Sequence, residues 1–325
     1  MNVRRLIPTA AIASATVLGL TALSACSSSE AADKNGDGTL NVVASFYPMQ
    51  FLAQEIGGDH VSVETLTEPG VEPHDLELSP KQTASLGEAD MILYLKSIQP
   101  AVDDAIGQSG VENTVDAATL TKLEQHGTEV GHDHGDEHGE EHSDEGEGEG
   151  EAGADPHIWL DPVKYAEVAE GVGKAMEKAD PDHAKAYKKN TKDLVEKLDA
   201  LNTKFEDGLK NTKTKTFITT HSAFGYLAER YGLDQEGIAG LDPESDPSPA
   251  RIKELQGIAK EDEVSTVFFE TLASDKTAKT LAGDAGLKTD VLDPLEGITD
   301  KSKGDDYIGV MESNLAALEK ALGAK

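Results

Sequence analysis

The sequence predicts an α/β protein with a central, mostly parallel β-sheet in each of two halves and one long helix between them. Short apolar runs alternate with helical patterns from residue 40 onward, a long helix-period pattern follows, and the alternation then resumes. Such alternation is typical of parallel sheets that are covered by helices. With 325 residues, the chain is long enough for two medium-sized domains.

The strands of the first half are predicted from three short segments. Residues 40–46 and 91–95 are predominantly apolar, which indicates buried strands, and residues 61–66 alternate between apolar and polar side chains. A helix is expected between the second and third strands, over residues 79–86.

Two helices are predicted in the middle of the chain. The first covers residues 162–178, and Asp180-Pro181 opens the second. The apolar positions of the second helix recur every three or four residues, which is the helix period: Ala184, Tyr187, Thr191, Leu194, Leu198, Leu201, Phe205 and Leu209. At 1.5 Å per residue this helix is roughly 43 Å long, enough to run across both halves.

The second half repeats the pattern of the first. Strands are predicted over residues 216–220, 264–270 and 287–292, and an amphipathic helix closes the chain over 306–322. Ser248-Pro249 provides a helix start, because serine is a favoured N-cap and proline is tolerated at the first helical position. No nucleotide-binding fingerprint is present in the sequence.

The N-terminus has the features of a bacterial lipoprotein signal. Arg4 and Arg5 precede an apolar stretch over residues 7–23, and Leu23-Ser24-Ala25-Cys26 resembles a lipobox. Lipidation at Cys26 would anchor the mature protein to the bacterial cell membrane, outside the cytoplasm. The alternatives are an ordinary signal peptide and a short membrane span. We therefore divide the chain into a signal peptide (1–25), a flexible tether (26–39), an N-terminal lobe (40–180), a linking helix (181–211) and a C-terminal lobe (212–325).

Composition excludes several classes of function. The chain has 29 Lys and Arg against 61 Asp and Glu, a formal net charge of −32, so a nucleic-acid backbone would be repelled. The single cysteine excludes an intramolecular disulfide, a zinc ribbon and an iron–sulfur cluster.

An acidic insert at about residues 124–155 interrupts the N-terminal lobe. It has 13 acidic residues, no Lys or Arg, and many glycines, so we expect a disordered loop. Two H-x-x-E-H matches occur in it, but that protease pattern requires a stable helix, which the glycines and the like charges oppose. We interpret the insert as an accessory, weak metal-binding loop, with a solvated segment of no role as the alternative. Its histidines are His126, His132, His134, His138 and His142.

Three other histidines and one aspartate lie where strands are expected to end or helices to begin. His74 follows the strand over 61–66, His157 precedes the helix over 162–178, and His221 follows the strand over 216–220. Asp293 follows the strand over 287–292 in the same way. Because ligands of open α/β sheets bind outside the carboxyl ends of the strands, these four side chains could converge on one metal ion. His60 and His183 are expected to be surface groups.

The order of motifs resembles a known family. Gly-Val-Glu-Pro-His-Asp at 70–75, the acidic insert, Asp-Pro-His-Ile-Trp-Leu-Asp-Pro at 155–162, the long helix, Thr-His-Ser-Ala-Phe-Gly-Tyr at 220–226 and Leu-Asp-Pro-Leu at 292–295 are similar to the zinc-binding lipoproteins of bacterial zinc ABC importers. These are the ZnuA- and AdcA-like members of the cluster A substrate-binding proteins, and the resemblance covers about residues 40–322.

The resemblance implies a fold, a site and a function. It implies two similar α/β lobes joined by one rigid helix, with the metal between the lobes and with His74, His157 and His221 as ligands. Asp293 matches the fourth position by motif, and Glu72 or water are the alternatives. The implied function is extracytoplasmic capture of Zn²⁺ and its delivery to an integral-membrane ABC permease, by a monomer that is not an enzyme.

Three competing functions remain open at this point. Manganese binders of the family usually carry Glu where this chain has His221, and a third imidazole favours zinc over manganese. Three histidines and a water would also suit a catalytic zinc, with Glu270 as a general base. A purely structural metal site is the third alternative, although its ligands are usually close together in sequence.

Overall fold

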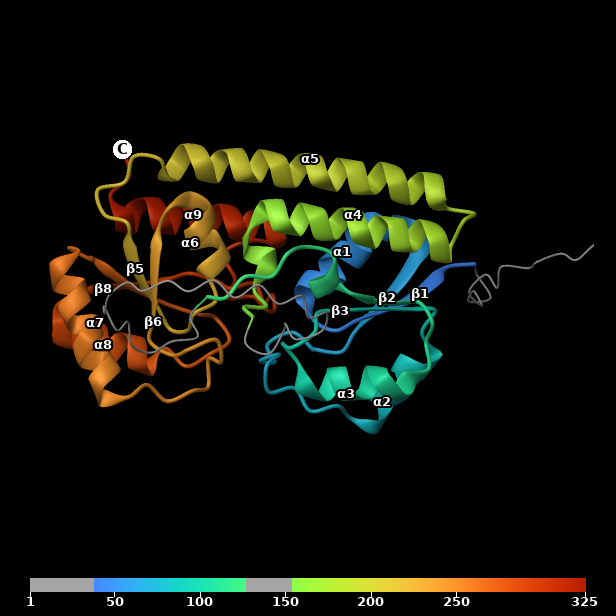
Figure 1. Ribbon diagram of the computed structural model, residues 1–325, viewed down its shortest axis with the longest axis horizontal. Helices are drawn as coiled ribbons and strands as arrows, with labels where there is room; N and C mark the ends of the chain where they lie inside the picture. Colours follow the sequence, from blue (N-terminus) through green and yellow to red (C-terminus); the bar gives the residue numbers. More distant parts are fainter. Residues whose placement is uncertain (1–37, 127–153) are drawn as a thin grey trace, which may run out of the picture. The chain divides into compact units, whose positions relative to one another are not determined.

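The computed structural model describes residues 38–126 and 154–325, which form two four-stranded parallel sheets (Figure 1). The first sheet has the strand order β2-β1-β3-β4 and the second β6-β5-β7-β8. Pairing is parallel throughout, with Val42 of β1 opposite both Val63 of β2 and Met91 of β3. The strands are β1 (Leu40–Ala44), β2 (Val61–Thr65), β3 (Met91–Tyr94), β4 (Thr114–Asp116), β5 (Thr216–Thr219), β6 (Asp234–Gly237), β7 (Thr266–Phe269) and β8 (Lys288–Val291).

The two sheets share one topology, which confirms the predicted fold of two similar α/β lobes. In each, the first strand in sequence lies between the second and the third, so the strand order reverses beside β1 and beside β5. The carboxyl ends of strands at such a reversal are the usual place for a ligand. Sequence periodicity did not find β4, which is short, or β6, whose sequence DQEG contains no apolar run.

Helices cover both faces of each sheet. Neighbouring residues of β1 point to opposite sides, with Val42 in one apolar core and Val43 in another. In the second lobe Phe217 and Ile218 of β5 are divided in the same way. The helices are α1 (Tyr47–Gly57), α2 (Pro80–Glu88), α3 (Pro100–Ser109), α4 (Pro162–Ala179), α6 (Gly225–Tyr231), α7 (Pro249–Glu261), α8 (Lys276–Ala285) and α9 (Tyr307–Leu322), with short 3-10 turns η1 (Gly58–His60), η2 (Ala117–Thr119) and η3 (Ile158–Leu160).

The long helix α5 (Ala184–Leu209) joins the two lobes (Figure 1). It packs against α1 and α4 of the first lobe and α9 of the second, so one continuous core extends from β1 to α9. Of its eight predicted core positions, all but Ala184 are buried. The helix begins at Ala184 rather than at Pro181, because the Asp180 carboxylate accepts hydrogen bonds from His183 Nδ1 (2.6 Å) and the Tyr187 hydroxyl (2.8 Å) and holds a turn before it.

The contact between α4 and α5 depends on a glycine. A Cβ atom at Gly173 would lie 2.2 Å from Thr191 Oγ1, which donates a hydrogen bond to the Tyr187 carbonyl within the buried face of α5. We expect Gly173→Ala to lower the free energy of unfolding by about 1–3 kcal/mol, because overpacking outweighs the gain in helix propensity. Gly257→Ala is the matched control: that helical position is open, so the same change should stabilise by up to ~1 kcal/mol. Urea denaturation of both variants measures the difference, and equal effects would contradict this account.

Several predictions fall outside the described residues. These are the lipidation site Cys26 and the insert histidines His132, His134, His138 and His142. The proposed domain boundaries remain a division made from the sequence. Within the ranges that the structure describes, no helix combines the length and the apolar character needed to cross a membrane.

Candidate metal centre

Each of the three predicted histidines is held by its own loop. His74 lies between β2 and α2, and its backbone N–H donates to Glu72 Oε1 (3.1 Å). His157 directly precedes η3, and His221 follows β5. The side chains of His157 and His221 are fully buried, whereas that of His74 is 12% exposed.

The imidazoles of His157 and His221 are oriented by carboxylates. His157 Nδ1 donates to Asp155 Oδ1 (2.7 Å), and His221 Nδ1 donates to Glu270 Oε1 (2.6 Å). An ionised carboxylate is only an acceptor, so the proton sits on Nδ1 and Nε2 is the atom that faces the centre. Glu270, the candidate general base of the catalytic alternative, thus holds a histidine through Oε1.

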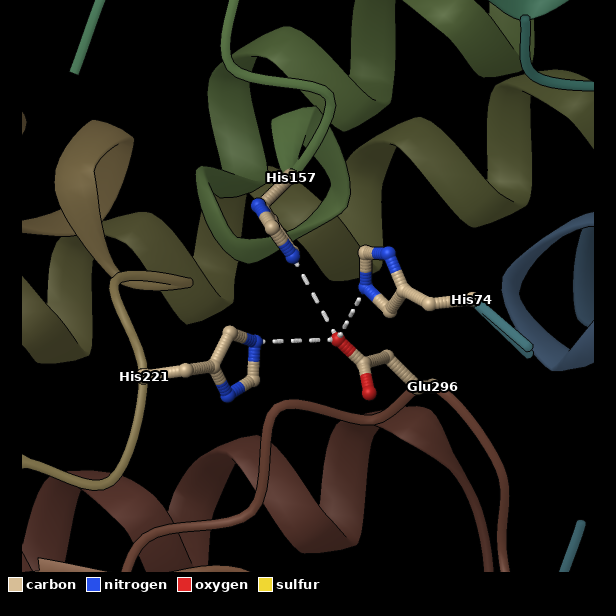
Figure 2. Close-up of side chains that lie close together, drawn as sticks. All are labelled: His74, His157, His221 and Glu296. Carbon is tan, nitrogen blue, oxygen red and sulfur yellow. Dashed lines mark hydrogen bonds and ion pairs between the residues drawn. The ribbon is translucent and has the colours of Figure 1, made fainter. Parts of the chain in front are cut away.

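Glu296 completes the cluster (Figure 2). Its Oε1 atom lies 3.4 Å from His74 Nε2 and 3.3 Å from the Nε2 atoms of both His157 and His221. One ligand atom from each of the four residues lies within 4.8 Å of all the others. Ligands about 2.0–2.1 Å from a tetrahedral metal are about 3.3–3.4 Å apart, so the separations from Glu296 match the edge of such a tetrahedron.

The fourth position differs from the sequence prediction. Asp293 is outside the cluster, because Oδ1 accepts from the Leu295 backbone N–H (2.9 Å) and Oδ2 from the Thr271 hydroxyl (3.2 Å). Asp293 therefore shapes the turn that presents Glu296. The alternative Glu72 is also absent from the cluster, and its Oε1 accepts from the His74 backbone N–H instead.

Two features position the Glu296 loop. Leu295 adopts a φ of 58°, an uncommon conformation for a residue with a side chain, and one that is often found beside functional sites. Trp159 Nε1 donates to the Pro294 carbonyl (2.7 Å), and the Tyr307 hydroxyl donates to the Trp159 carbonyl (2.6 Å). The segment after His157 is thereby tied to the loop that carries Glu296.

The electrostatics of the centre are those of a site built for a cation. Burial acts to raise the pKa of Glu296, yet the facing imidazoles hold it well below its usual value. Burial would lower the pKa of His221, but Glu270 and Glu296 raise it well above its usual value. His157 Nε2, His221 Nε2 and Glu296 Oε2 are buried and have no hydrogen-bond partner among the described residues. A bound cation would satisfy such atoms.

Glu72 adds a partly buried carboxyl beside the cluster. Burial and the repulsion of Glu296 raise the pKa of Glu72 to about 8. Like charges disfavour each other, so the Glu72 carboxyl tends to hold a proton near neutral pH. A cation at the cluster would relieve that repulsion.

His126 was predicted to belong to the accessory metal-binding loop, and it is the one histidine of that set that the structure describes. It belongs to the described part of the chain, where Nδ1 donates to Asp155 Oδ2 (3.0 Å) and Nε2 lies 3.0 Å from Glu229 Oε2. Its side chain is 18% exposed. Composition predicts that the insert begins near residue 124, yet Asp155 is buried and Glu124, His126 and Ala154 are partly buried.

The fold and the cluster define a two-lobed protein in which three histidines and one glutamate converge on a place that could hold a metal ion. A family model described as "Zinc-uptake complex component A periplasmic" matches residues 42–321, and the chain belongs to this family.

Individual relatives agree with this assignment. The high-affinity zinc uptake system protein ZnuA of Bacillus subtilis is 39% identical over 93% of this chain and 94% of its own length. The zinc-binding lipoprotein AdcA of Streptococcus pneumoniae (strain TIGR4) is 38% identical, but the chain spans only 58% of it. The crystal structure of the Zn(II)-bound ZnuA-like domain of pneumococcal AdcA superposes with a TM-score of 0.70 at 34% identity, covering 88% of this chain and 99% of that domain.

Proposed function

We propose that this protein captures Zn²⁺ outside the cytoplasm and delivers it to an integral-membrane ABC permease. The observation that carries the proposal is the convergence of three imidazole Nε2 atoms on one buried carboxylate oxygen, at 3.3–3.4 Å. The names of the Bacillus subtilis and pneumococcal relatives, a zinc uptake protein and a zinc-binding lipoprotein, support it.

The ligand set favours zinc over manganese. Imidazole suits zinc, whereas carboxylates, carbonyls and water suit manganese. Three nitrogens and a single carboxylate therefore give zinc the advantage, which the Irving–Williams order increases. Manganese capture by the same site is an outcome of the test below.

We propose a carrier rather than a hydrolase. With Glu296 as the fourth ligand, protein atoms fill a tetrahedral sphere and leave no position for an activated water. Glu270 Oε1 accepts from His221 Nδ1 at 2.6 Å, which gives this carboxylate a role in positioning a ligand rather than that of a base. These two observations weigh against the catalytic alternative.

The first test is a zinc titration of the protein without its insert. Asp155 N–H donates to the Glu124 carbonyl (2.9 Å), so a short Gly linker can replace residues 127–153 without disturbing the lobes. The mature chain, stripped of metal, is titrated with Zn²⁺ and with Mn²⁺ against a competing chelator. Trp159, the only tryptophan, provides a fluorescent reporter because its ring lies 5.2 Å from that of His157.

We expect one tight zinc site that remains after deletion of the insert and is filled poorly by manganese. Loss of tight binding on deletion would place the binding residues in the insert and refute the cluster. A preference for manganese would retain the carrier role but change its cargo.

Anchoring is proposed through a lipid on Cys26. We expect Cys26→Ser to release the protein from the cell surface into the soluble fraction, since acyl chains at about 0.8 kcal/mol per buried CH₂ hold it there. Fractionation and mass spectrometry of the mature N-terminus test this, and a variant that stays membrane-bound would contradict it.

We also propose that the protein acts as a monomer, because Val71 is the only large hydrophobic side chain that is exposed among the described residues.

A further inference from the structure

The two ends of the acidic insert are fastened to each other beside the metal centre. The Tyr226 hydroxyl accepts from the Glu124 backbone N–H (2.8 Å) and donates to the Asp155 carbonyl (2.8 Å). Asp155 N–H also donates to the Glu124 carbonyl (2.9 Å). Tyr226 lies on α6, so the second lobe holds this junction of the first.

Asp155 divides its buried carboxylate between two histidines. Oδ1 accepts from both the backbone N–H (2.9 Å) and Nδ1 (2.7 Å) of His157, while Oδ2 accepts from His126 Nδ1 (3.0 Å). The chain of contacts therefore runs from His126 through Asp155 to the imidazole that faces the metal centre. Each link is a charge-assisted hydrogen bond, the stronger kind.

The local packing is built to admit His126. A Cβ atom at Gly225 would lie 2.4 Å from His126 Cβ and 2.9 Å from Asp155 Oδ2, so only glycine allows this approach. The His126 ring meets Tyr226 edge to face, with centroids 4.6 Å apart. Its Nε2 atom is held by Glu229 (3.0 Å), so contacts on several sides fix the ring.

We propose that His126 is a positioning residue of the metal centre, which acts through Asp155 to hold His157 with Nε2 toward the ion. Outer partners of metal-binding histidines fix the tautomer and the ring orientation, and their loss typically weakens binding 10–100-fold. His126 acts one step further out, by fixing the rotation of the Asp155 carboxylate. This inference rests on the proposed zinc site.

The same contacts oppose a role for His126 as a zinc ligand. Both ring nitrogens are engaged by carboxylates, and a metal would have to displace one of them. Asparagine distinguishes the two roles. Its amide nitrogen can replace the Nδ1 donor toward Asp155, but it lacks the imidazole that a zinc ligand needs.

The chain provides a matched control. His183 Nδ1 likewise donates to a buried aspartate, Asp180 Oδ2 (2.6 Å), but the same oxygen accepts from the Tyr187 hydroxyl (2.8 Å) and not from a histidine of the metal centre. His183→Ala therefore removes an equivalent His–Asp bond without touching the cluster.

The experiment compares His126→Ala, His126→Asn and His183→Ala with the wild type. We expect His126→Ala to weaken zinc binding about tenfold in chelator competition, the lower end for an outer partner. His126→Asn should restore most of this loss, and His183→Ala should bind as the wild type does. Thermal unfolding of the three variants shows how much stability each has lost.

A second measurement does not depend on zinc. The His157 Nδ1 proton should give a low-field NMR signal in the metal-free wild type and in His126→Asn, and should exchange faster with water in His126→Ala. Unchanged affinity and exchange in His126→Ala would overturn the inference, and so would equal losses in His126→Ala and His126→Asn. Failure of the wild type to bind zinc would refute the proposed function instead, while the exchange measurement would still test the positioning of His157.

Discussion

Replacing Glu296 by glutamine is expected to weaken zinc binding by on the order of 100-fold or more, beyond the 10–100-fold loss typical of outer partners. Glu296 supplies the single anionic ligand atom in the cluster, and its Oε1 lies within 3.4 Å of all three imidazole nitrogens. Glutamine keeps the size of the side chain but removes the charge that balances the cation. Chelator competition with the purified variant measures the loss.

Asp293→Asn is the control for this variant. Its carboxylate lies in the same loop but bonds to Leu295 and Thr271, so its replacement should alter zinc affinity much less than that of Glu296. If Asp293→Asn loses zinc while Glu296→Gln retains it, the fourth ligand is Asp293 and the loop rearranges around the metal.

The second large effect is the dependence of zinc affinity on pH. In the metal-free protein, burial alone would lower the pKa values of His157 and His221. The Asp155 carboxylate raises the pKa of His157, and the Glu270 and Glu296 carboxylates raise that of His221. Zinc binds only neutral imidazole and must displace these protons. The apparent affinity should therefore fall about tenfold per pH unit for each displaced proton as the pH is lowered through the raised pKa values.

The stability of the metal-free protein should change in the opposite direction. A histidine whose pKa is raised on folding contributes stability that is present below its unfolded value, about 6.5, and is lost as the pH rises through its folded value. The pKa of Glu72 is raised to about 8 on folding, so this carboxyl also costs the folded protein stability as the pH rises from the ordinary pKa of glutamate toward 8. Thermal unfolding should thus show that the metal-free protein loses stability from neutral to alkaline pH. The rise in unfolding temperature that zinc causes should grow over the same range.

Calorimetry gives an independent check on these protons. Zinc titrations in buffers of different ionisation enthalpy should reveal the release of at least one proton at neutral pH. Affinity that is flat between about pH 5 and pH 8, with no proton release, would contradict a site with three imidazole ligands.

The sequence was sufficient for the architecture because both lobes repeat one simple pattern. Apolar segments identified six of the eight strands among the described residues, and the three- and four-residue spacing identified the buried face of α5. The positions of His74, His157 and His221 beside predicted strands and helices brought them to one place in the structure.

Glu296 was missed because its position depends on contacts that periodicity does not encode. It lies beyond the end of β8 in a loop, where the positive φ of Leu295 and the bond from Trp159 to Pro294 set the direction of the chain. The Leu-Asp-Pro-Leu motif at 292–295 favoured Asp293, which lies three residues before Glu296. The hydrogen bond between His126 and Asp155 was not predicted either, because the acidic composition around His126 indicates a loop. This bond forms only when α6 packs on the junction between the two ends of the insert.

The four side chains of the proposed zinc site come in two pairs, one from each lobe. His74 and His157 belong to the first lobe, and His221 and Glu296 belong to the second. Each lobe alone would therefore offer a metal ion only two ligands. An ion held by one pair meets the other at a high effective concentration, and affinity arises from this linkage. Because bond lengths near a metal tolerate only tenths of an ångström, parting the lobes by about 1 Å would undo the chelate effect. The residence time of the ion is then governed by how firmly α5 and its neighbours keep the two pairs in register.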